Sequence, residues 1–103
     1  VLHVLNRELK ADFDVDAFDH VSVWDPENGW IEMRLRACRA MTVRLPAVGM
    51  TIHFAKGEEM RTEISGKFQR AAFGDELREA AFADPMWWTD PDERFALILT
   101  AAA

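Results

Sequence analysis

Glu63 and Ser65 lie two residues apart in the segment EEMRTEIS, and this spacing lets a carboxylate and a hydroxyl act on one small ligand. Alternate residues of an extended strand point to opposite faces of a sheet. The expected polar face consists of Glu59, Arg61, Glu63 and Ser65, opposite Met60, Thr62 and Ile64. A neutral imidazole needs such a pair, because its N–H donates to a carboxylate and its bare nitrogen accepts from a hydroxyl. The solvated face of an edge strand has the same pattern, so spacing alone leaves both interpretations open.

Other reactive side chains have no spacing that indicates a catalytic or metal site. His3, His20 and His53 are scattered, and none lies at a metal-ligand spacing from another or from Cys38. Surface or edge histidines are therefore expected. Nearby arginines make Cys38 a candidate for a thiol of low pKa, but an ordinary strand residue is the favoured interpretation. The glycines never form the G-x-G-x-x-G or P-loop pattern, so this chain alone is expected to bind no cofactor.

The composition limits the partners of the chain. Its 103 residues correspond to one domain at most, and a first residue of Val1 favours a piece of a longer protein. With 18 acidic against 12 basic side chains, a net charge of -6 and a pI near 4.9, it is not expected to bind nucleic acid. The apolar stretch 95–103 is about half of the ~20 residues that cross a membrane, so no membrane partner is expected. The single cysteine agrees with a cytoplasmic location.

The first part of the chain is expected to form a helix and a turn. Its leucines recur at helical spacing, which predicts an amphipathic helix over residues 1 to about 10. The following segment ADFDVDAFD lacks the Gly and terminal Glu of a calcium-binding loop. It is instead expected to form a short helical turn capped by Asp14. The side chains expected to pack inward from this turn are Phe13, Val15 and Phe18.

From Asp19 to Ser65, polar and apolar residues alternate between regularly spaced turn residues, which predicts an antiparallel meander. VSVW and WIEMRLRA are expected to form a hairpin whose turn contains Asn28 and Gly29. MTVRL and MTIHF form a second hairpin around PAVG, and EEMRTEIS is the last strand. On the strand WIEMRLRA, alternation places Ile31, Met33 and Leu35 on one face and Trp30, Glu32, Arg34 and Arg36 on the other.

After Gly66 the spacing of apolar residues becomes helical again. It predicts a helix over about 69–82, weakened by Gly74 and ended by Asp84 and Pro85. MWWTD and RFALILTA then form a closing antiparallel hairpin. The sequence therefore predicts an α+β fold with an N-terminal helix, antiparallel hairpins, one helix near the C-terminus and a closing β-hairpin.

Four segments in order resemble the histidine Nα-methyltransferases of ergothioneine biosynthesis, namely NRELKADFD, WIEMRLRA, GEEMRTEISGKF and WWTDPDERFALIL. The resemblance extends from Asn6 to Leu99, and RTEIS-KF followed by WWTDP is its most specific part. It implies that the chain is a C-terminal fragment of a Rossmann-like methyltransferase with its substrate domain. Residues 1–66 would be the C-terminal portion of the substrate domain. Residues 67–103 would be the last helix and β-hairpin of the methyltransferase domain.

The resemblance also implies an activity and roles for three residues. Enzymes of this family use S-adenosylmethionine to methylate the α-amino group of L-histidine three times, which gives hercynine. The carboxylate and hydroxyl of the family's R-T-E-x-S motif hold the imidazole and correspond to Glu63 and Ser65. The methionine of the I-E-M motif lines the pocket near the amine and corresponds to Met33, although a flexible core side chain fits this position equally well.

Several parts of the family's active site have no counterpart in this sequence. The Gly-rich turn for S-adenosylmethionine is missing, as are the tyrosine and asparagine that hold the substrate's amino and carboxylate groups, and the chain contains no tyrosine. The fragment is therefore expected to contribute the imidazole-binding part of the pocket and to be inactive alone. A free-standing module that binds a small ligand or dimerises, and a relative that methylates another amine, are the alternatives. Bare strand edges with Trp87, Trp88 and Leu97 also predict self-association.

Overall fold

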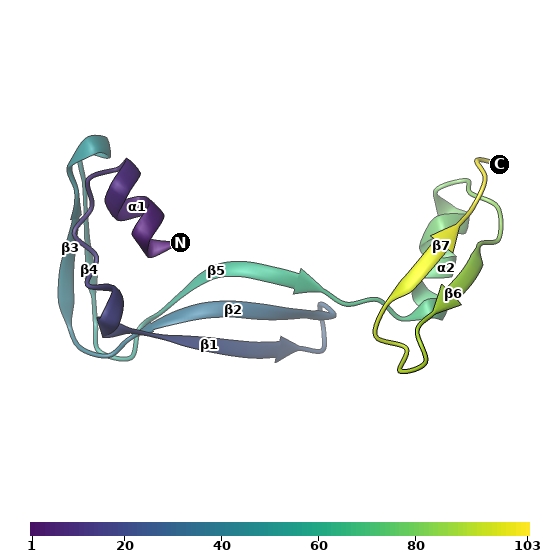
Figure 1. Cartoon of the computed structure of the whole chain (residues 1–103), viewed down its shortest axis with the longest axis horizontal. Coiled ribbons are helices and arrows are strands. Elements are labelled where there is room, and N and C mark those ends of the chain that lie inside the picture. Colours follow the sequence, from purple (N-terminus) through teal and green to yellow (C-terminus); the bar gives the residue numbers. More distant parts are fainter. The chain divides into compact units, whose positions relative to one another are not determined.

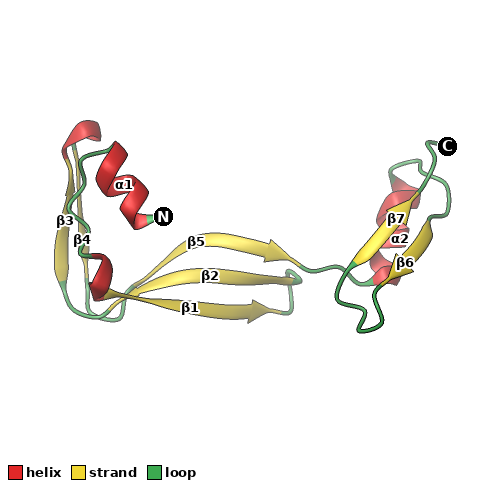
Figure 2. Ribbon diagram, viewed as in Figure 1, coloured by secondary structure: helices red, strands yellow, loops and turns green.

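The computed structural model describes all 103 residues, which divide into two compact units, Val1–Lys67 and Phe68–Ala103. The first unit consists mostly of antiparallel strands, and the second contains one helix and one hairpin (Figure 2). These elements confirm the predicted α+β class. No helix of the chain is both long enough and apolar enough to cross a membrane.

Three long strands of the first unit form one antiparallel sheet in the order β1-β2-β5 (Figure 1). They are β1 (Phe18–Asp25), β2 (Trp30–Ala37) and β5 (Glu59–Gly66). The predicted β1–β2 hairpin is confirmed, because its turn residues provide the required geometry. Asp25 Oδ1 accepts hydrogen bonds from two backbone N–H groups of the turn, at 3.0 and 3.1 Å, and Gly29 adopts a φ of 67°.

The strands β3 (Met41–Leu45) and β4 (Met50–Phe54) form a separate two-stranded ribbon. The chain reverses between them through the short 3-10 turn Pro46–Val48 and Gly49, whose φ of 62° lies in the left-handed region that suits glycine. The predicted second hairpin is therefore confirmed.

The predicted meander is wrong in one respect, because β5 pairs with β2 and not with β4. Backbone hydrogen bonds at the base of the β3–β4 ribbon explain why the chain returns to β2. The N–H of Gly57 donates to the carbonyl of Ala37 at 2.8 Å, and the N–H of Ala37 donates to the carbonyl of Glu58 at 2.9 Å. These bonds bring the chain back to the end of β2, so the ribbon becomes an insertion between two neighbouring strands.

The hydrophobic core of the first unit is formed by α1 (Leu2–Glu8), the following turn and the strand ends around the ribbon. Its buried members are Leu2, Phe13, Phe18, Ala37, Val43, Leu45 and Phe54. Phe18 and Phe54 pack edge to face with their ring centroids 5.3 Å apart, and burial of each such side chain contributes ~1.5–3 kcal/mol. The predicted N-terminal helix forms because its leucines cover this core.

The aspartate-rich segment after α1 forms the predicted short helical turn, Val15–Ala17, but not through the predicted cap. The side chain of Asp14 makes no capping hydrogen bond. Its carboxylate instead accepts a hydrogen bond from Arg39 at 2.8 Å, an ion pair that ties the turn to the segment after β2. The turn is short enough to close through the backbone alone, with the N–H of Ala17 donating to the carbonyl of Asp14.

The second unit contains α2 (Arg70–Glu79) and the hairpin of β6 (Met86–Thr89) and β7 (Ala96–Leu99). The helix ends before the predicted residue 82, because Ala81 adopts a left-handed φ of 64°. Trp87, which was expected to be exposed, is half-buried and packs edge to face on Phe73 with centroids 6.0 Å apart. The closing hairpin is confirmed.

Candidate functional site

A cavity of about 330 Å³ lies in the first unit where α1 and the start of β1 meet the central part of β2 and β5. We call it the sheet hollow. Its polar lining consists of His3, His20, Thr62 and Glu63. Its apolar lining includes Leu2, Phe18, Met33 and Leu35. An apolar floor with a few polar groups at its edge suits a small ligand that has one flat apolar part and one or two hydrogen-bonding atoms.

Met33 and Glu63 are directly opposite each other in the β2–β5 pair, so both side chains reach the hollow from one face of the sheet. Ser65 is opposite Ile31, on that same face and two residues farther along β5, and it is not part of the lining of the hollow. The three residues predicted to form the site are thus on one face, with two of them at the hollow and the third beside it.

The predicted polar face of β5 is wrong, because the strand contains a β-bulge. Met33 pairs with Glu63 while the next residue of β2, Arg34, pairs with Arg61, so Thr62 has no partner. The extra residue reverses the alternation at this point. Glu63 and Ser65 therefore share the face of Met33, whereas Arg61 and Glu59 lie on the opposite face with Arg34.

That opposite face is covered by a network of ion pairs. Glu32 is buried, with 7% of its surface exposed. It accepts hydrogen bonds from Arg34 Nε at 2.9 Å, from Arg61 Nη1 at 3.2 Å and from Trp30 Nε1 at 3.2 Å. Hydrogen bonds from Arg34, and then from Trp30, hold the pKa of Glu32 below its ordinary value, and they outweigh the desolvation that raises it.

Glu59 joins the same network from the end of β5. Its carboxylate accepts from Arg34 Nη1 at 3.1 Å and from Arg36 Nη2 at 3.0 Å. The hydrogen bond from Arg36, followed by that from Arg34, lowers the pKa of Glu59. Both acids of this face are therefore already bound by arginines, which leaves them no role towards a ligand in the hollow.

Two residues of the hollow, His3 and His20, were predicted to be surface or edge histidines, and both are exposed as predicted. The structure places them in one lining, because α1 packs over the start of β1. His20 had a signal in the sequence, since it is two residues after the buried Phe18 and shares its face of β1, although its own side chain is exposed. His3 had none, because its position depends on how the helix docks.

Cys38 is not the strand residue that was predicted, since it is exposed in a bend after β2. Desolvation, followed by a hydrogen bond with the carboxylate of Asp19, raises the pKa of its thiol. This direction is opposite to the low pKa considered from its arginine neighbours. No group of three or more His, Cys, Asp or Glu side chains is placed to hold a metal ion.

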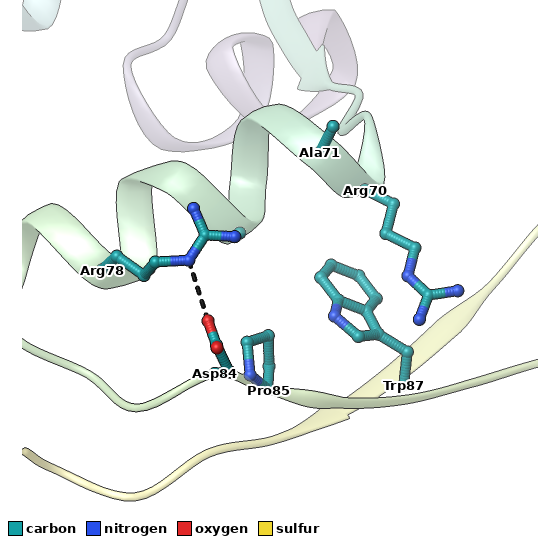
Figure 3. Close-up of a pocket in the computed structure, with 7 residues that line it drawn as sticks. Arg70, Ala71, Arg78, Asp84, Pro85 and Trp87 are labelled. Atoms are coloured by element: carbon teal, nitrogen blue, oxygen red, sulfur yellow. Dashed lines mark hydrogen bonds and ion pairs between the residues drawn. The ribbon is translucent and has the colours of Figure 1, made fainter.

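The second unit has its own cavity of about 470 Å³ between α2 and β6 (Figure 3). The guanidinium of Arg70 lies 5.5 Å from the ring centroid of Trp87, and Arg78 Nε donates to Asp84 at 2.8 Å. These contacts neutralise or cover the two arginines that line the cavity. None of the residues predicted to form a site is located here.

The sequence over residues 1–102 matches the family described as histidine-specific, SAM-dependent methyltransferases. The chain belongs to this family. It is 50% identical over 99 residues to a histidine N-alpha-methyltransferase of Mycolicibacterium smegmatis, and 50% identical over 101 residues to that of Mycobacterium tuberculosis. These alignments cover 96% and 98% of the chain but 31% and 32% of the relatives. The chain thus spans about a third of the length of these methyltransferases.

A more distant relative of the chain is the N-methyltransferase fsqC of Aspergillus fumigatus, which is 34% identical over 83 residues. The alignment covers 81% of this chain and 22% of that protein. A free-standing binding module, the alternative from the sequence, is not favoured by a chain that matches one part of longer methyltransferases throughout.

The glycines of the chain do not fit the binding of S-adenosylmethionine, the methyl donor of the family. Gly29, Gly49 and Gly57 have positive φ values and lie in turns, Gly66 ends β5, and Gly74 is buried inside α2. All strand pairs are antiparallel. The parallel strand followed by a Gly-rich turn and a helix N-terminus, which typically binds such nucleotide groups, is not formed by these residues.

Proposed function

We propose that this chain supplies the imidazole-binding part of the substrate pocket of a histidine Nα-methyltransferase. The observation that carries the proposal is the pairing of Met33 with Glu63 at the sheet hollow, with Ser65 on the same face. The 50% identity to two histidine N-alpha-methyltransferases supports histidine as the substrate. In the complete enzyme, S-adenosylmethionine supplies the methyl groups that convert L-histidine to hercynine.

The carboxylate of Glu63 accepts the imidazole N–H, and the hydroxyl of Ser65 donates to the bare ring nitrogen. Glu63 is exposed and belongs to none of the ion pairs of the chain, so its oxygens are free to accept. An analogue without ring nitrogens leaves both protein groups unsatisfied, at a cost of ~1–3 kcal/mol each. In this proposal the two residues determine specificity and take no part in acid–base catalysis.

Met33 provides an adaptable apolar wall beside the carboxylate. It is half-buried, lines the hollow and directly faces Glu63 across the two strands. A thioether contributes dispersion contacts to a flat ring without competing for its hydrogen bonds. Since methyl transfer to a neutral amine is a displacement, orientation of the substrate can lower the barrier by several kcal/mol.

The two units are assigned to different parts of the proposed enzyme. Residues 1–66 form the C-terminal portion of its substrate domain, and residues 67–103 form the last helix and hairpin of its methyltransferase domain. In the second unit Trp88 and Leu97, which are opposite each other in the hairpin, are 48% and 69% exposed. Apolar exposure of this extent supports self-association of the isolated chain. The one free cysteine supports a cytoplasmic location.

The proposal is tested in the full-length protein that contains this chain by replacing Glu63 with Ala. Because a hydrogen bond to a charged group contributes ~1.5–3 kcal/mol, affinity for L-histidine should fall by about 10- to 100-fold in titration calorimetry. Glu27→Ala removes an exposed carboxylate from the β1–β2 turn and serves as the matched control. Unchanged affinity in Glu63→Ala would contradict the imidazole-binding role.

Histidine is the first substrate to examine, and a different amine is the second. The second candidate is suggested by the 34% identity to fsqC, which is named only as an N-methyltransferase. Turnover of a panel of amino acids by the full-length enzyme separates the two candidates. Methylation of an amine without an imidazole, at the rate of histidine, would favour the second.

A further inference from the structure

The β-bulge at Thr62 determines which way the proposed imidazole-binding residues point. On one side of it, Met33 pairs with Glu63, and on the other side Arg34 pairs with Arg61. Because successive residues of a strand point to opposite faces, a regular strand would put Glu59 and Glu63 on the same face. The one extra residue at the bulge puts these two acids on opposite faces instead.

Contacts on both faces hold this arrangement. At the bulge itself, Thr62 Oγ1 donates a hydrogen bond to the backbone carbonyl of Met33 at 3.2 Å. On the face away from the hollow, Arg61 Nη1 donates to the carboxylate of Glu32 at 3.2 Å. The first contact fixes the unpaired residue to the partner strand, and the second fixes the residue that precedes it.

A slip of one residue in β5 would be costly for recognition, because it moves every side chain of the slipped part to the other face. Glu63 and Ser65 would then leave the face of Met33, and Ile64 would replace them beside the hollow. Backbone hydrogen bonds anchor both ends of β5, from the N–H of Ala37 to the carbonyl of Glu58 and from the N–H of Lys67 to the carbonyl of Gly29, but they do not fix where between these ends the extra residue lies. The side-chain contacts of Thr62 and Arg61, together with the ion pairs of Glu59, favour the observed register.

We propose that Thr62 is a positioning residue, whose hydroxyl fixes the bulge that turns Glu63 and Ser65 towards the sheet hollow, with the Arg61–Glu32 ion pair as a second anchor on the opposite face. The inference rests on the proposed function, since it explains how the pocket for an imidazole is kept in register. Although Thr62 also lines the hollow, its hydroxyl proton is donated to the carbonyl of Met33, so its assigned role is to position that backbone.

The test uses the full-length enzyme with Thr62→Val, which keeps the shape and removes the hydroxyl, and Thr62→Ser, which keeps the hydroxyl. Thr62→Val should raise KM for L-histidine by about three- to tenfold, as expected for one lost hydrogen bond, with KM for S-adenosylmethionine unchanged. Thr62→Ser should retain the wild-type KM. Thr51→Val, the same change in β4 and outside the lining of the hollow, is the matched control.

Arg61→Met separates positioning from direct contact, because Arg61 is on the face away from the hollow. It should also raise KM for L-histidine while KM for S-adenosylmethionine stays constant. A wild-type KM for histidine in both Thr62→Val and Arg61→Met, or an equal rise in KM for both substrates, would overturn the inference. If Glu63→Ala still weakens histidine binding in that case, only the role of the bulge fails. If Glu63→Ala binds histidine normally as well, the proposed function fails.

Discussion

The two faces of the β1-β2-β5 sheet use carboxylates in opposite ways. On one face Glu32 and Glu59 are held by three arginines, and hydrogen bonds lower the pKa of both acids. On the other face Glu63 belongs to no ion pair and lies at a cavity with an apolar floor. The acids come from the same two strands and differ mainly in the partners that surround them.

This difference separates acids that stabilise the fold from an acid that is available to a ligand. A carboxylate bound by arginines has its lone pairs occupied, and its removal leaves unpaired cations. A carboxylate without partners contributes little to stability and can accept a hydrogen bond from a substrate. Removal of an acid from the first face should therefore lower mainly stability and removal of Glu63 mainly ligand binding, whereas Arg61 contributes to both because it also anchors the register of β5.

The largest effect on stability is expected from Arg34→Met, because Arg34 binds both Glu32 and Glu59. Its loss leaves the buried Glu32 and its neighbour Glu59 with fewer donors, and Tm should fall by about 5 °C. Differential scanning fluorimetry measures the change, with Arg7→Met as a control for an exposed arginine at the end of α1. Histidine affinity should fall less than in Glu63→Ala. A larger loss of histidine affinity in Arg34→Met than in Glu63→Ala, with little change in Tm, would contradict the distinction between the two faces.

A smaller effect on binding is expected from Ser65→Ala. Removal of one neutral hydroxyl donor should weaken L-histidine binding by about three- to tenfold, with little change in Tm. Thr51→Ala in β4 is the control, since it removes an exposed hydroxyl outside this sheet and outside the lining of the hollow. Competition binding with a histidine analogue that has no ring nitrogens provides the readout. If Ser65→Ala weakens binding of the analogue by the same factor as binding of L-histidine, Ser65 does not act on the imidazole.

The smallest effect is the dependence of stability on pH. The pKa values of Glu32 and Glu59 are lower in the folded chain than their ordinary value of 4.5, so their ion pairs stabilise the fold above about pH 4.5. This stability is lost as the pH falls through the lower folded values. Tm should be nearly flat from about pH 7 to 5 and should fall below about 4.5.

The combined variant Glu32→Gln, Glu59→Gln is the comparison for this profile. The Tm of this variant should fall less steeply in acid than that of the unchanged protein. Some decrease should remain, because the pKa values of Asp25 and Asp90 are also lowered by hydrogen bonds within their own turns. If Tm falls as steeply in acid as it does in the unchanged protein, the ion pairs of Glu32 and Glu59 do not contribute to stability in this pH range.

Local patterns in the sequence predicted most elements of the fold. Alternation and turn residues such as Asp25 and Gly29 indicated the hairpins, and leucine spacing indicated α1, because these features depend on neighbouring residues. The pairing of β5 with β2 was not predictable in this way. It depends on backbone hydrogen bonds between Ala37 and residues about twenty positions later.

The sequence selected the residues of the candidate site, whose binding roles stay a prediction, but it did not give their geometry. Motif resemblance selected Glu63, Ser65 and Met33, and all three lie on one face. Simple alternation placed Glu63 on the same face as Glu59, because it assumes a regular strand. The sequence around Thr62 gives no sign of the bulge that breaks this regularity. The histidine of α1 at the hollow was also missed, since its place depends on the packing of the helix over the sheet.

The most direct measurement of the central claim is a crystal structure of the full-length enzyme with L-histidine bound. We predict that the imidazole lies at the sheet hollow, with one ring nitrogen within about 3 Å of the Glu63 carboxylate and the other within about 3 Å of the Ser65 hydroxyl. The thioether of Met33 should contact the same ligand, and Thr62 should remain unpaired at the bulge. An imidazole bound elsewhere, or Glu63 and Ser65 on the face of Glu32, would contradict the account.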